Sequence, residues 1–226
     1  MDIQQKIKEI KQSFRLMMDG SVAQSMRQKG VDYRLNWGAT IPRLRQMADE
    51  IRRELTTADA PTDASPAPQP SDAGSLYHLS VALWKEDVRE CKILATMLMP
   101  ADEMLPEVAD IWMEQTTTAE LAEQAAFNLY QHTPFAAELA FRWLASERDL
   151  AQLCGYHVLS RLFQQRREPT ERAINEFLDQ ALAALQSANP LLRKAAMQAV
   201  VHFADMGLVY ERMARGALRT IHLDFL

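Results

Sequence analysis

Basic side chains and one tryptophan are the residues whose type and spacing could do chemistry in this sequence. Trp37 lies in a glycine-containing connector beside Arg34 and is either packed or in contact with a ligand. Two basic sets follow, one on a single side of an expected helix and one at the edges of later helices. They are Arg43, Arg45, Arg52 and Arg53, then Arg166, Arg167, Arg193 and Lys194. Each set is typical of a solvated helix face, and the alternative is contact with phosphates.

Other catalytic chemistries find no support in the residue pattern. The five histidines lack ligand spacing with acidic or thiol partners, so we expect no metal and no other cofactor. A glycine-rich phosphate loop and a Ser/His/Asp arrangement are also missing. Cys91 and Cys154 each fall in an apolar helical segment and read as buried free thiols, which favours the cytoplasm.

The charge distribution bounds the class of partner. The net charge is −5 over 226 residues, but it is uneven. Residues 1–55 hold 11 Lys/Arg and 7 Asp/Glu, residues 56–150 hold 5 and 16, and residues 151–226 hold 9 and 7. Because binding to a polyanion depends on neutralising its phosphates, composition argues weakly against DNA unless the end segments gather their cations on one face.

Helical periodicity runs through nearly the whole chain. Apolar residues recur at steps of three and four, whereas alternating strand-like runs are missing, so the sequence predicts an all-α fold. The clearest pair of helices spans Leu79–Leu98, where a short charged turn forces two helices to lie antiparallel. Helix pairs recur about every 35–45 residues, which indicates HEAT/armadillo-like repeats in an α-α superhelix, a curved solenoid whose concave face binds ligands.

The expected organisation is one domain over residues 1–226. Residues 56–75 interrupt it, since four prolines among Ala, Ser, Thr and Asp predict a flexible insertion. The N-terminal segment reads as an amphipathic helix rather than a signal peptide. No apolar run is long enough to span a bilayer, so we expect no membrane partner.

Three segments carry a resemblance to a known family. Residues 33–48, YRLNWGATIPRLRQMA, resemble the G-x-x-x-P-x-L-R signature of the bacterial DNA alkylation repair family, the AlkD-like HEAT-repeat DNA glycosylases. Leu83-Trp84 with residues 88–95, VRECKILA, is similar to that family's LW…R-E-x-x-x-L-A element. Residues 192–196, LRKAA, resemble its late V-R-K-A-I helix.

The resemblance implies a curved helical shell around duplex DNA and removal of alkylated purines by cleavage of the N-glycosidic bond. It implies that a carboxylate stabilises positive sugar character in the transition state. The family's W-D-x-x-D element falls on residues 119–123, where Glu123 supplies a carboxylate but Ala119 replaces the tryptophan. Arg161 is the nearest arginine to the one that the family places close to Leu153.

Two functions follow as expectations. In the first, the chain is a DNA-binding relative of alkylpurine DNA glycosylases with slight or undetectable base excision, since most site residues of the family are replaced. Its catalytic carboxylate would be Glu123, which otherwise reads as a solvated residue near a helix N-terminus. The expected DNA-binding residues are Trp37, Arg43, Arg45, Arg161, Arg193 and Lys194. In the second, the chain is a non-catalytic scaffold that binds a protein on its concave face.

Overall fold

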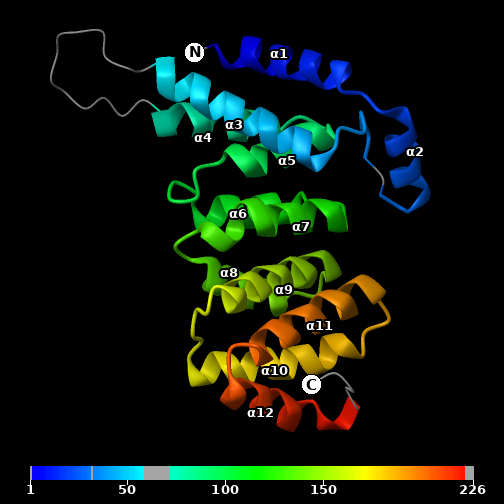
Figure 1. Ribbon diagram of the computed structural model, residues 1–226, viewed down its shortest axis with the longest axis vertical. Coiled ribbons are helices and arrows are strands. Elements are labelled where there is room, and N and C mark those ends of the chain that lie inside the picture. The colour runs from blue at the N-terminus through cyan, green and yellow to red at the C-terminus, as the bar shows by residue number, and fades with distance from the viewer. Residues whose placement is uncertain (1, 32, 59–71, 222–226) are drawn as a thin grey trace, which may run out of the picture. The chain divides into compact units, whose positions relative to one another are not determined.

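The computed structural model describes residues 2–31, 33–58 and 72–221 (Figure 1). Within these residues, side-chain caps and prolines set where the helices begin. The Asp2 carboxylate accepts hydrogen bonds from the amides of Gln4 and Gln5 at 3.0 and 3.3 Å, and so starts the first helix. Asn189 caps a late helix in the same way, with Pro190 in the first turn, where no amide hydrogen is needed.

Every regular element among the described residues is helical, which confirms the predicted all-α fold. The chain divides into two compact units, Met1–Leu105 (unit 1) and Pro106–Leu226 (unit 2). The described helices of unit 1 are α1 (Ile3–Leu16), α2 (Gly20–Gln28), α3 (Ile41–Ala58), α4 (Asp72–Trp84) and α5 (Arg89–Leu98). Those of unit 2 are α6 (Pro106–Glu114), α7 (Ala119–Asn128), α8 (Ala136–Leu144), α9 (Asp149–Gln164), α10 (Glu171–Leu185), α11 (Pro190–Ala204) and α12 (Leu208–Ala217), with short 3-10 turns at Tyr130–His132 and Arg219–Ile221.

Unit 1 is built around the α4–α5 pair that the sequence predicts. Helix α5 packs against α4 and α3, and α1 packs against α4. Phe14, Leu44 and Trp84 are buried in the core of this unit. The tryptophan that closes α4 is therefore a core residue.

Unit 2 is organised around α9, against which α7, α8 and α11 all pack (Figure 1). Most of α9 is buried, and Gly155 brings its backbone close to α8, where an added Cβ would lie 2.8 Å from the carbonyl oxygen of Ala140. The rings of Phe163, Phe177 and Phe203 lie 5.0–5.3 Å apart and join α9, α10 and α11 in one aromatic core.

The two helices that flank the proline-rich segment are longer than the sequence predicts. Helix α3 continues to Ala58 and α4 begins at Asp72, so both ends of the expected 56–75 insertion are helical. Its remaining residues, 59–71, lie outside the described part of the chain. The organisation of residues 1–226 as a single domain stays a prediction. None of the described helices is both long and apolar enough to cross a membrane.

Candidate nucleic-acid interface

Three helices of unit 2 form a row, α7, α9 and α11, in which α9 packs against both neighbours. The register between α7 and α9 is fixed by a buried contact, in which the Cys154 thiol donates to the carbonyl oxygen of Ala122 at 3.5 Å. Burial raises the pKa of this thiol, so it remains a neutral donor. Residues just after Ala122 on α7 therefore lie level with the middle of α9.

Glu123 is the carboxylate that this register places beside the middle of α9. It is half-buried, and burial raises the pKa of its carboxyl group above the usual value. Lys194 on α11 and Arg161 on α9 act in the opposite direction, whereas Glu120 on the same helix adds to the rise. The predicted catalytic carboxylate and two predicted DNA-binding cations are thus close enough to act on one another's charge, and we call these residues of the three helices the cluster.

Arg161 lies over an aromatic ring of the neighbouring helix. The central carbon of its guanidinium is 4.2 Å from the centroid of Phe127, which is four residues after Glu123 on α7. Its Nη1 donates to Gln164, while its buried Nε has no hydrogen-bond partner among the described residues. The arginine is therefore held in place by packing, with part of its donor capacity unused.

His157 lies one turn before Arg161 and packs edge-on against Phe127, with ring centroids 5.3 Å apart. The side chain is buried, and its Nδ1 has no partner within the described residues. Burial lowers the pKa of His157 to about 4, with smaller contributions from the positive charges of Arg161 and Lys194. The imidazole is consequently neutral at physiological pH.

A chain of hydrogen bonds joins Arg161 to α11. The guanidinium donates to Oε1 of Gln164 at 3.0 Å, which leaves the amide nitrogen to donate to Nε2 of His202 at 2.9 Å. The His202 ring then carries its proton on Nδ1, which lies 2.6 Å from the hydroxyl oxygen of Ser160. Because a guanidinium can only donate, the amide oxygen of Gln164 must face Arg161 and its amide nitrogen must face His202.

The two adjacent cations of α11 have different environments. Nη1 of Arg193 donates to the carbonyl oxygens of Ser187 and Ala188 at 2.6 and 3.0 Å, so this side chain closes the turn before its own helix. Lys194 is exposed and close enough to Glu123 and His157 to influence the pKa of both. Of the two, Lys194 is the cation available to a phosphate in the cluster.

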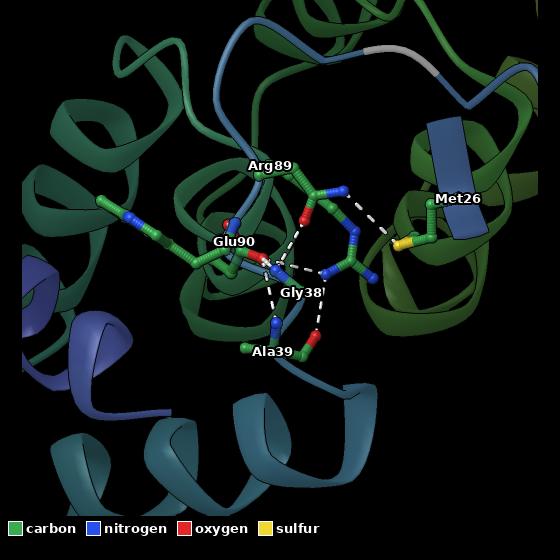
Figure 2. A network of polar contacts seen from close by, with 7 residues as sticks. Met26, Gly38, Ala39, Arg89 and Glu90 are labelled. Carbon is green, nitrogen blue, oxygen red and sulfur yellow. Dashed lines mark hydrogen bonds and ion pairs between the residues drawn. The ribbon is translucent and has the colours of Figure 1, made fainter. Parts of the chain in front are cut away.

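The connector that contains Trp37 is held by a buried carboxylate, and Figure 2 shows this carboxylate, Glu90, with Gly38 and Ala39. Glu90, fully buried at the start of α5, accepts hydrogen bonds from the amides of Trp37, Gly38 and Ala39 at 3.0–3.3 Å. The guanidinium of Arg89 lies 3.2 Å from the same carboxylate and donates to the Ala39 carbonyl at 2.8 Å. The R-E pair therefore fixes the connector before α3.

Trp37 is half-buried by this arrangement. Its ring lies 5.7 Å from that of Phe14, and its carbonyl oxygen accepts from the amide of Asp19 at 2.8 Å. Arg43 and Arg45, in the first turns of α3, are exposed. The pKa of Asp19 is lowered chiefly by hydrogen bonds from Ser21 and Val22, and to a smaller extent by the positive charge of Arg43. A role for Trp37, Arg43 and Arg45 in DNA binding stays a prediction.

The polar partners around Arg161 are the part of the site that sequence reasoning missed. The sequence offers His157 and His202 no partners for a metal, and within the described residues no group of three or more His, Cys, Asp and Glu side chains could hold a metal ion. The sequence does contain one signal for these partners. His157, Arg161 and Gln164 are spaced at steps of four and three, which places them on one face of a helix.

Comparison with known proteins decides the family. The sequence profile described as DNA alkylation repair enzyme matches residues 10–200. The chain belongs to the DNA alkylation repair enzyme family. No curated protein matches its sequence.

One solved structure extends the comparison for this family member to three dimensions. It is the structure of a protein from a family described as new, as related to the HEAT-like repeat DNA glycosylases and as having affinity for branched DNA structures. The match has a TM-score of 0.74 at 13% sequence identity and covers 95% of this chain and 82% of the other. At this identity the likeness shows the fold, and it confirms the predicted HEAT-like helical repeat.

Proposed function

We propose that this protein binds DNA through the row formed by α7, α9 and α11, and that it has little or no glycosylase activity. The observation that carries the proposal is that Arg161 lies over Phe127, one turn after Glu123, and that Arg161 and Lys194, from two different helices, both act on the Glu123 carboxyl group. The two cations face two carboxylates here, Glu123 and Glu120, so the cluster as a whole carries no net charge. Arg161 and Lys194 are the groups of the cluster that a phosphate would contact.

Family membership and the solved relative support the same proposal. The relative is described as having affinity for branched DNA, so we include both duplex and branched DNA among the forms that this chain would bind. The acidic middle of the sequence does not oppose binding locally. Lys194 is close enough to Glu123 to act against the rise of its pKa, so positive charge reaches this point despite the acidic composition of residues 56–150.

The charges around Glu123 argue against efficient base excision. A carboxylate stabilises a cationic sugar through its negative field, and Arg161 and Lys194 act against that field. We therefore expect slight or undetectable release of methylated purines, and strong release that disappears in Glu123→Gln would contradict this.

A salt titration of DNA binding tests the proposal. Anisotropy of a labelled duplex and of a four-way junction is measured at several salt concentrations, with Arg161→Gln and Lys194→Gln as variants. Each variant should weaken binding and reduce the slope of log K against log salt by about one. Arg172→Gln, an exposed charge on α10, is the matched control and should leave the slope closer to that of the natural protein.

Absence of binding at the lowest salt would contradict the proposal, because non-specific affinity for DNA grows as salt is removed. The alternative function would then be a scaffold that binds a protein partner. For location we propose the cytoplasm, which is supported by the two buried free thiols of Cys91 and Cys154.

A further inference from the structure

We propose that Glu123 acts as an electrostatic gate rather than as a catalyst, serving as the internal counter-ion of Arg161 and Lys194 with which a DNA phosphate competes. This inference rests on the proposed DNA binding and adds a mechanism of regulation to it. Its central claim is that the carboxylate weakens binding, and that neutralising it strengthens binding.

The positions of the side chains support the competition. The thiol–carbonyl contact between Cys154 and Ala122 places Glu123 level with the middle of α9. One turn later, Phe127 contacts the Arg161 guanidinium, so the carboxylate and the arginine lie over the same face of α7. Glu123 is half-buried there, whereas Lys194 is exposed. A phosphate that approaches the two cations from solvent therefore meets the carboxylate as a competing anion.

The charged and titratable groups that face Glu123 come from all three helices. They are Glu120 on α7, Arg161 on α9 and Lys194 on α11, and His157 on α9 has the same two cations as neighbours. His157 is buried and neutral above about pH 4, so it contributes no charge in the range where binding would be measured. The balance at physiological pH is thus between two carboxylates and two cations.

Arrival of a phosphate changes this balance. It adds negative charge beside a half-buried carboxylate whose pKa burial already raises, and so it raises that pKa further. By linkage, binding takes up a proton onto Glu123, and lower pH strengthens binding. The result would be a DNA affinity that rises as the solution becomes mildly acidic.

The decisive experiment compares Glu123→Gln with the natural protein in anisotropy titrations of a labelled duplex, at low salt and from pH 5.5 to 8. Glutamine keeps the shape and removes the charge. We expect Glu123→Gln to bind about fivefold more tightly at pH 8, since it removes one unit charge close to the phosphate. Its affinity should change less with pH than that of the natural protein.

Glu176→Gln is the matched control, because it removes the same charge from a position on α10, outside the row. His202, whose pKa burial lowers, is present in all three proteins, so its titration cancels from the comparison. An affinity of Glu123→Gln equal to or below that of Glu176→Gln would overturn the gate. Thermal unfolding of each variant establishes that the comparison is between folded proteins.

A second measurement follows protons rather than affinity. Calorimetric titration with duplex DNA near pH 6, in two buffers of different ionisation enthalpy, reports the protons bound on association. We expect a net uptake that is smaller in Glu123→Gln, and equal uptake by both proteins would overturn the gate. If Arg161→Gln and Lys194→Gln weaken binding while Glu123→Gln has no effect, the gate fails but the DNA interface stands. If none of these variants changes binding, both fail.

Discussion

The guanidinium of Arg161 lies 4.2 Å from the centroid of the Phe127 ring, so a cation of α9 rests on an aromatic side chain of α7. The ring removes water from one face of the guanidinium and restricts its rotation. A side chain held in this way loses less conformational freedom when it binds a phosphate. The contact therefore links the packing of two helices to the electrostatics of the cluster.

We expect Phe127→Leu to weaken DNA binding by about threefold, because it removes the cation–π contact while keeping an apolar side chain on α7. The change in duplex affinity is measured by anisotropy at low salt. Phe141→Leu, at a half-buried position of α8, is the control for the loss of an aromatic ring. Equal affinities of the two variants would contradict the role assigned to the ring.

Gly38→Ala should destabilise the protein by about 3 kcal/mol. Gly38 has a φ of 77°, and an added Cβ would lie 2.1 Å from the carbonyl oxygen of Asp19, so the connector held by Glu90 must shift. Gly30→Ala is a matched control, since Gly30 has a φ of 78° but open space around its Cβ. It should cost only about 1–2 kcal/mol from backbone strain, as measured by urea unfolding.

Gly155→Ala should separate close helix packing from helix propensity. A Cβ on Gly155 would lie 2.8 Å from the Ala140 carbonyl oxygen and 3.3 Å from Leu144, so α8 and α9 must move apart. We expect a loss of about 2 kcal/mol in the free energy of unfolding. Gly216→Ala, in open space on α12, should instead gain up to about 1 kcal/mol, and a gain in both variants would contradict the packing argument.

Acid should lower the free energy of unfolding, because the buried His157 resists protonation in the folded protein. Its pKa is about 4 in the folded protein and near 6.5 when unfolded, so the unfolded chain binds the proton first as pH falls. The stabilisation is complete above pH 6.5 and is lost between pH 6.5 and about 4, which amounts to about 2 kcal/mol at pH 4.5. Urea unfolding of His157→Leu should show a smaller loss between pH 7 and 4.5, whereas the exposed His132→Gln should match the natural protein.

Much of the fold could be predicted from local signals. The cap at Asp2, the proline in the first turn at Pro190 and the apolar periodicity of the α4–α5 pair all act within a few residues of chain. The burial of Trp84, Trp112 and Trp143 also follows from their apolar helix faces. The proline-rich segment was predicted too long, because α3 and α4 extend into it from both sides.

The site depended on contacts that sequence spacing does not contain. Nothing in the sequence links Arg161 to Lys194, and only the packing of α9 between α7 and α11 brings both near Glu123. Arg193 looks equivalent to Lys194 in sequence, yet its guanidinium binds the carbonyl oxygens of Ser187 and Ala188. These carbonyl partners depend on how the turn before α11 folds. Residue type and spacing alone therefore cannot predict that Lys194, and not Arg193, is available to a phosphate.

The position of α9, with α7, α8 and α11 all packed on it, has a consequence for motion. Local opening of a neighbouring helix leaves most of the packing of α9 intact, whereas opening of α9 removes the support of all three. Backbone amides of α9 should therefore be the slowest of unit 2 to exchange with deuterium. If this unit adjusts to bent or distorted DNA, we expect α7, α8 and α11 to move relative to α9, while α9 itself stays rigid.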